Sequence, residues 1–204
     1  MLLRAEQISK SYPTAKDGPV VKPTSLMVEQ GTIHVIQGKS GSGKSTLLSL
    51  LGGMERPTTG SVYIESKSLY DLSDAEQARI RGEYFGFVFQ SFHLVPELTV
   101  QENIVLPLRF SGQAIRLDHV RELAAELGIQ SKLAMRPAFL SGGEQQRVAI
   151  ARAMIAEPKI IFADEPTGNL DQKTSKDVIK ALTRLCVDSG QALLVVTHEQ
   201  DLIQ

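Results

Sequence analysis

The most informative stretch of the sequence is Gly38-Lys39-Ser40-Gly41-Ser42-Gly43-Lys44-Ser45. It fits the pattern G-x-x-x-x-G-K-[ST]. The apolar run Ile33–Ile36 precedes it, and the leucine-rich segment Lys44–Leu51 follows it. These neighbours predict a strand, a glycine-rich loop and a short buried helix, which is the context that the pattern requires.

The chemistry of this loop indicates phosphate binding. Its glycines let the backbone approach a phosphate group closely, and the N–H groups of the loop then point inward together with the N-terminus of the helix. The Lys44 ammonium would reach the β- and γ-phosphates of a nucleotide, and the Ser45 hydroxyl would bind Mg²⁺. The alternative is an ordinary Gly/Ser turn before a helix, and the flanking strand and helix argue against it.

Strands and helices alternate along the rest of the chain. Strands are predicted at Ser61–Ile64, Phe85–Phe89, Lys159–Ala163 and Ala192–Thr197. Helices are predicted over Val100–Phe110 with an interruption at Pro107, between Asp118 and Gly128, from Ser141 to before Pro158, and around Val178–Cys186. Short β-rich runs that alternate with helices imply a parallel sheet with crossover helices.

The composition is that of an ordinary globular protein. The 204 residues are 42% hydrophobic and 22% charged, which indicates one domain. Lys and Arg number 22 against 23 Asp and Glu, so no basic surplus indicates nucleic acid or anionic lipid as the main partner. The one cysteine, Cys186, cannot form an internal disulfide, and apolar runs such as Ala192–Val196 are too short to span a bilayer. We therefore expect a soluble protein of a reducing compartment.

A second apolar strand ends in two carboxylates. Lys159–Ala163 is followed directly by Asp164 and Glu165. Because buried parallel strands deliver their carboxyl ends to the ligand crevice, we expect Asp164 to lie near Ser45 and to hold Mg²⁺ through a coordinated water. Glu165 then stands where it can polarise the attacking water as a general base. The alternative is a solvated acidic turn before Pro166.

A further segment, Leu140-Ser141-Gly142-Gly143-Glu144-Gln145, lies between these two sites in the sequence. A hydroxyl and two glycines at the start of a helix can bind an anion. A chain with one complete phosphate loop has no evident need of a second, so the segment is interpreted as serving the nucleotide of another copy of the chain. An N-capped helix with a glycine turn explains the same residues equally well.

Leu140–Gln145 resembles the signature motif of the ATP-binding cassette (ABC) ATPases. The order of phosphate loop, glutamine, signature, Asp-Glu strand and histidine matches that family across essentially the whole chain. The resemblance implies an α/β fold: a P-loop NTPase (RecA-like) mixed sheet core with an N-terminal antiparallel β region and an inserted α-helical subdomain. It implies one ABC ATPase domain over 1–204, with 1–90 and 158–204 as the nucleotide-binding core and 91–157 as the helical subdomain.

The resemblance also implies ATP and Mg²⁺ as ligands and a role for each matching residue. The residues implied to bind ATP are Tyr12, Gly38, Lys39, Ser40, Gly41, Ser42, Gly43, Lys44, Ser45 and Thr46, and those implied to bind Mg²⁺ are Ser45, Gln90 and Asp164. The residues implied to take part in catalysis are Glu165, His198, Gln90 and Lys44. Contact with the ATP of the other protomer is implied for Ser141, Gly142, Gly143 and Glu144, and a D-loop is implied at Asn169, Leu170 and Asp171. Two alternatives remain: Tyr12 as the edge of the core, and His198 as a surface histidine at a strand end.

Two stretches, Gly86–Pro96 and Ala163–Asp171, are similar to one subgroup of the family, the ATPases of lipoprotein release, macrolide efflux and bacterial cell division. This resemblance implies mechanotransmission, in which closure of an ATP-bound homodimer moves an extracytoplasmic machine. It implies an integral membrane permease subunit that contacts the region Phe92–Phe110, no nucleic acid, and a cytoplasmic chain held on the inner face of the bacterial membrane by that partner.

Three other functions stay open at this point. They are a soluble ABC ATPase acting on nucleic acid or the ribosome, a non-transporting regulatory ATPase of the cell-division type, and a non-hydrolysing scaffold. The single cassette and the near-zero charge disfavour the first, and Glu165 and His198 disfavour the last. The sequence ends at Gln204, whereas members of the family usually continue further past the histidine, so we expect either a truncated or a compact form.

Overall fold

The computed structural model of the chain describes residues 1–13 and 18–198. The strands are β1 (Leu3–Lys10), β2 (Val21–Val28), β3 (Ile33–Gln37), β4 (Thr59–Ile64), β5 (Lys67–Ser68), β6 (Phe85–Phe89), β7 (Ile160–Asp164) and β8 (Ala192–Thr197). The α-helices are α1 (Lys44–Leu51), α2 (Asp74–Tyr84), α3 (Val100–Ser111), α4 (Leu117–Glu126), α5 (Gly142–Met154) and α6 (Gln172–Asp188). Short 3₁₀ helices lie at Leu69–Asp71, Gln130–Lys132 and Pro137–Phe139.

The centre of the fold is a parallel sheet with the strand order β3-β8-β7-β6. Its strands bury both faces, as parallel strands between helical layers do. In β7, Ile160 and Phe162 pack into one core cluster, whereas Ile161 and Ala163 pack into the other. The parallel register places the carboxyl ends of β3, β7 and β8 at one edge of the sheet.

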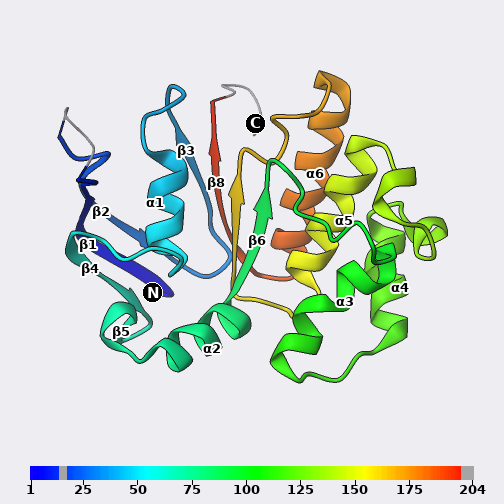
Figure 1. The fold of residues 1–204 in the computed structure, drawn as a ribbon, viewed down its shortest axis with the longest axis horizontal. Helices are drawn as coiled ribbons and strands as arrows, with labels where there is room; N and C mark the ends of the chain where they lie inside the picture. Colours follow the sequence, from blue (N-terminus) through cyan, green and yellow to red (C-terminus); the bar gives the residue numbers. More distant parts are fainter. Residues whose placement is uncertain (14–17, 199–204) are drawn as a thin grey trace.

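A second sheet, of antiparallel strands in the order β2-β1-β4-β5, lies beside the first (Figure 1). Helix α1 lies between the two sheets, and its leucines join one core cluster that both sheets share. The expected antiparallel N-terminal region is therefore present, and the antiparallel and parallel strands form two separate sheets. Pro23 is tolerated in β2 because this strand lies at the edge of its sheet.

Helices α3, α4, α5 and α6 cover the other face of the parallel sheet, on the right of Figure 1. Their buried side chains form the second core cluster together with β6, β7 and β8. In the described part of the chain, no helix has both the length and the hydropathy that crossing a bilayer requires.

Most predicted elements are confirmed, and two differences have a physical reason. The interruption at Pro107 is wrong: α3 runs from Val100 to Ser111 through the proline. Proline removes one intrahelical hydrogen bond, but Ile104 and Leu108 on the two neighbouring turns are buried and hold the helix on the core. Helix α2 was not predicted, because Ile80 is its one buried residue and it shows no apolar periodicity.

Candidate functional site

The phosphate loop lies at the carboxyl edge of the parallel sheet, as the sequence predicts. It connects β3 to α1, and it opens on a cavity of about 570 Å³. The lining residues come from five separate parts of the chain: Val20, Ser40, Gly41, Ser42, Gly43, Lys44, Ser45, Thr46, Gln90, Glu165 and His198. All three residues outside the loop to which the sequence analysis gives a catalytic role, Gln90, Glu165 and His198, thus face one cavity with the loop.

The Lys44 side chain is buried and points back over the loop. Its Nζ donates to the carbonyl oxygens of Gly38 at 2.8 Å and Lys39 at 3.1 Å. The same Nζ lies 3.6 Å from Glu165 Oε1. The Lys44 ammonium group therefore lies within the phosphate loop, where its positive charge suits a bound phosphate.

The backbone of the loop depends on glycine at Gly43, which precedes α1. This residue has a φ of 87°, and a Cβ there would lie 2.3 Å from the carbonyl oxygen of Val20. No other residue fits this close approach. Val20 therefore shapes the loop from outside, a role that no pattern in the sequence indicates.

Ser45 and Asp164 meet although they are 119 positions apart in the sequence. The Ser45 hydroxyl donates to Asp164 Oδ1 at 2.8 Å. Burial raises the pKa of Asp164, and the nearby Glu165 carboxylate raises it further, whereas the Ser45 hydrogen bond and Lys44 act in the opposite direction. A partly buried carboxylate beside a hydroxyl and a phosphate pocket fits Mg²⁺, which takes hard oxygen ligands and retains waters and substrate phosphates.

Binding of Mg²⁺ at this place does not require a complete set of protein ligands. No cluster of three or more His, Cys, Asp or Glu side chains able to hold a metal ion occurs among residues 1–13 and 18–198. A magnesium ion at this edge would therefore rely on a few protein oxygens, those of Ser45, Asp164 and Gln90, and on the phosphates of the substrate, as is usual for this ion.

Glu165 and His198 contact each other directly. His198 Nδ1 lies 2.7 Å from Glu165 Oε2, and the His198 backbone N–H donates to the same oxygen at 3.3 Å. This short contact joins the two side chains at the carboxyl ends of β7 and β8. Glu165 also has a φ of 45°, a conformation that non-glycine residues rarely adopt and that its surroundings must hold in place.

Gln90 is fixed to the predicted D-loop by two hydrogen bonds. Its Nε2 donates to Asn169 Oδ1 at 3.1 Å, and Asn169 Nδ2 donates to the Gln90 carbonyl at 2.9 Å. Asp171, in the same D-loop, caps α6 by accepting from the backbone N–H groups of Lys173 and Thr174. Leu170 packs against the helical core cluster.

Tyr12 lies beside the phosphate loop but does not line the cavity. Its hydroxyl donates to Glu55 Oε2 at 2.8 Å, and this bond, together with burial, raises the pKa of Tyr12, while the Thr46 hydroxyl acts in the opposite direction. Lys10 lies 5.2 Å from the centre of the ring and 2.9 Å from Glu55 Oε1. The ion pair between Lys10 and Glu55 therefore holds the Tyr12 side chain in place beside Thr46.

The predicted signature segment lies outside the cavity. Ser141 caps α5 in a reciprocal arrangement: its Oγ accepts from the Glu144 N–H, and the Glu144 carboxylate accepts from the Ser141 N–H. A Cβ at Gly142 would lie 3.2 Å from Leu170, so the segment packs against the D-loop. Within the described chain, none of Ser141, Gly142, Gly143 and Glu144 lines the phosphate cavity of its own protomer.

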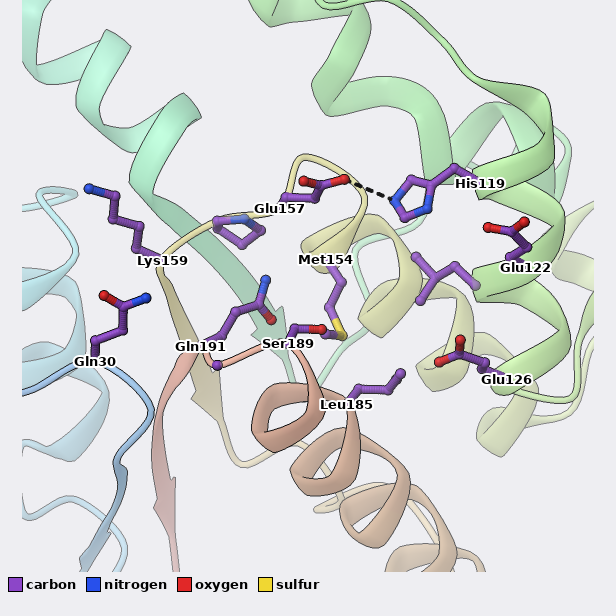
Figure 2. A pocket seen from close by; sticks show the side chains of 13 residues that line it. Gln30, His119, Glu122, Glu126, Met154, Glu157, Lys159, Leu185, Ser189 and Gln191 are labelled. Carbon is purple, nitrogen blue, oxygen red and sulfur yellow. Dashed lines mark ion pairs between the residues drawn. The ribbon is translucent and has the colours of Figure 1, made fainter.

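Another cavity, of about 490 Å³, lies at the opposite edge of the sheet (Figure 2). His119 lies across it from Gln191 and Lys159, and it pairs with Glu157 at 3.6 Å. Lys159 and Gln191 directly precede β7 and β8, whereas Asp164 and His198 stand at the carboxyl ends of these strands. Because ligands of parallel α/β sheets bind at the carboxyl ends of the strands, the phosphate cavity is the expected ligand site.

The fold and the cavity together define a phosphate-loop nucleotide triphosphatase. Residues 21–168 match the family described as ABC transporter, so the chain belongs to this family and is one of its ATP-hydrolysing enzymes. The family and the fold expected from the sequence are both confirmed.

Three similar proteins illustrate the relationship. A lipoprotein-releasing system ATP-binding protein LolD of Geobacter metallireducens is 44% identical over 98% of this chain and 91% of its own length. A macrolide export ATP-binding/permease protein MacB of Syntrophobacter fumaroxidans is 40% identical over 100% of this chain, which spans 29% of the longer protein. The dimeric post-hydrolysis structure of the ATP-binding cassette MJ0796 with ADP and Pi has a TM-score of 0.88 and 37% identity, over 98% of this chain and 90% of that one.

Proposed function

We propose that the chain is the ATP-hydrolysing subunit of a membrane complex of the lipoprotein-release or macrolide-export type, and that it works as a homodimer around two ATP molecules. The observation that carries the proposal is the separation of the two nucleotide-binding parts. A complete phosphate cavity is built within one chain, and the signature segment at the start of α5 lies outside it. Such a signature is useful only to the nucleotide of another copy.

In this proposal each residue of the cavity has one task in hydrolysis. Lys44 leaves the Gly38 and Lys39 carbonyls and binds the β- and γ-phosphates. Ser45, Asp164 and Gln90 are the residues that would hold Mg²⁺. When bound, Mg²⁺ offsets the negative charge of the phosphates and orients them.

Glu165 acts as general base on the attacking water. The water oxygen forms a bond to the γ-phosphorus, the bond from that phosphorus to the bridging oxygen of ADP breaks, and the proton of the water passes to Glu165. His198 fixes the orientation of this carboxylate through the 2.7 Å contact with Oε2. Tyr12 stacks on the adenine, and Asn169, Leu170 and Asp171 form the D-loop at the dimer interface.

The dimer is tested by placing a negative charge in the signature. Gly142→Asp is expected to bind ATP with unchanged affinity and to lose dimer formation with ATP, because the carboxylate would face the γ-phosphate of the other protomer. Light scattering with and without ATP measures the dimer, and Ala125→Asp, at an exposed position of α4, is the matched control. An ATP-dependent Gly142→Asp dimer as stable as the parent's would contradict this arrangement.

The membrane partner is proposed to bind a groove of about 840 Å³ between β6 and α3. Phe87, Phe89, His93 and Pro107 contribute to its lining, and Phe110, at its rim, is 84% exposed. An exposed aromatic side chain at an apolar groove is typical of a surface that receives a helix. Part of the region Phe92–Phe110 is instead core, since Leu94 packs against the helical cluster.

Copurification tests this groove. A tagged chain extracted from detergent-solubilised membranes of the producing cell is expected to retain an integral membrane protein, and Phe110→Asp is expected to reduce that recovery about 10-fold, as truncation of a buried interface anchor does. Val187→Asp, a change at another exposed apolar residue on α6, is the control and should leave recovery unchanged. Equal recovery by Phe110→Asp would place the contact elsewhere.

The remaining parts of the proposal follow from this assembly. Residues 1–90 and 158–204 form the nucleotide-binding core of one ABC ATPase domain, and 91–157 form the helical subdomain with the signature. The permease holds the chain on the cytoplasmic face of the membrane. The similarity to LolD and MacB supports a transporter subunit over an ATPase that acts on nucleic acid or the ribosome.

A further inference from the structure

Arg152, near the end of α5, has an unusual environment for a charged side chain. Its Nη1 donates to the His93 carbonyl at 2.5 Å, and its Nη2 donates to the Phe92 carbonyl at 2.7 Å. Burial lowers the pKa of this guanidinium, and no carboxylate pairs with it among residues 1–13 and 18–198. Two backbone carbonyl groups therefore hold this charge.

The two carbonyls belong to a backbone segment that needs support. Phe92 has a φ of 59° and His93 a φ of 48°, so two consecutive residues with side chains adopt the left-handed conformation. Such residues rarely adopt it unless their surroundings hold them there. The planar guanidinium, which presents several N–H groups in a fixed fork, suits two adjacent acceptors.

This segment directly follows Gln90, and α5 holds the chain on the other side of Gln90 as well. Gln146 Nε2 donates to the Phe89 carbonyl at 3.3 Å, and Gln146 is fully buried. Helix α5 thus binds the backbone immediately before Gln90 and again two and three residues after it. The same helix begins at the signature serine, Ser141, so the position of Gln90 is fixed relative to the signature segment.

We propose that Arg152 is a positioning residue for ATP hydrolysis: it holds the Phe92-His93 backbone on α5 and thereby keeps Gln90 in its place in the phosphate cavity. The inference rests on the proposed role of Gln90. Arg152 and His93 also line the proposed docking groove, next to Phe89.

The first test separates turnover from nucleotide binding. Arg152→Met, which retains the apolar stem, is expected to lower kcat roughly 10- to 100-fold, the order of effect that a small displacement of a catalytic group produces. The Kd for ATP and the number of nucleotide sites per chain should stay within about twofold, because the phosphate loop is untouched. Arg152→Lys should recover part of the lost kcat, because lysine can still donate to one carbonyl.

Arg147→Met is the matched control. Arg147 lies on the same helix and donates one hydrogen bond, at 3.1 Å, to the Leu127 carbonyl, away from Gln90. A purely structural role of Arg152 would lower the number of nucleotide sites, or lower kcat equally in both variants. Either result, or a kcat of Arg152→Met within twofold of the parent's, would overturn the inference.

A double-mutant cycle with Gln90→Ala distinguishes the inference from the function on which it rests. If Arg152 acts through Gln90, the variant with both substitutions is expected to be no slower than Gln90→Ala alone. Additive losses would overturn the positioning role of Arg152 while leaving Gln90 catalytic. An unchanged kcat in Gln90→Ala would instead overturn the proposed role of Gln90.

Discussion

Glu165→Gln is expected to bind ATP, to hydrolyse it 10²- to 10⁴-fold more slowly, roughly the range lost with a positioned general base, and to accumulate as a closed dimer. Glutamine has the shape of glutamate and can still accept from His198, but it cannot take up the proton of the attacking water. The geometry of the cavity is thus retained while the chemical step is lost.

The same substitution is expected to stabilise the closed dimer. Glu165 Oε1 lies 3.6 Å from Lys44 Nζ and lines the cavity that receives the γ-phosphate. Removing this negative charge reduces its repulsion of the bound triphosphate, and the γ-phosphate, which biases the pair toward closure, is no longer cleaved.

Phosphate release and light scattering, each with ATP and with ADP, measure the two effects. Glu126→Gln makes the same chemical change at an exposed position of α4 and should turn over like the parent. Full turnover by Glu165→Gln would exclude Glu165 as the base. Slow turnover without an ATP-dependent dimer would leave the base in place and contradict the proposed assembly.

Lys44→Ala is expected to lose affinity for ATP itself, in contrast to the change at Glu165. Hydrogen bonds to a charged group contribute about 1.5–3 kcal/mol, which corresponds to a loss of roughly 10- to 100-fold in affinity. The ammonium also donates to the loop carbonyls of Gly38 and Lys39. Lys44→Ala removes these hydrogen bonds, so the loop of the variant is expected to be less ordered before ATP binds.

Calorimetric titration with ATP measures this loss. Lys44→Met, which keeps the buried stem, should lose as much affinity as Lys44→Ala if the ammonium is responsible, and less if the effect arises from the space left by the side chain. Lys180→Met, on the exposed face of α6, should bind ATP like the parent. An unchanged Kd in both Lys44 variants would contradict the interpretation of the loop.

The elements with a strong local signal were predicted from the sequence. The phosphate loop, α1 and the buried strand β8 have the predicted positions, because a glycine-rich motif, a leucine-rich run and an apolar run specify them through nearby residues. Helix α2 shows where such prediction ends: its signal was the capping box of Ser73 and Glu76, which lies in a segment with almost no apolar face.

The family, the phosphate loop and the acidic pair Asp164-Glu165 at the end of β7 could be recognised from the amino-acid sequence alone, since each depends on short contiguous stretches whose residue types carry the chemistry. The folded structure was needed to show the contacts themselves: the hydrogen bond of Ser45 with Asp164, whose proximity the sequence predicted, the contact of Glu165 with His198, and the hydrogen bond of Arg152 with the backbone after Gln90. These contacts join segments 119, 33 and 60 positions apart. The physical reason is that strand order and helix packing, which arise from burial over the whole chain, set such distances, and no local pattern encodes them.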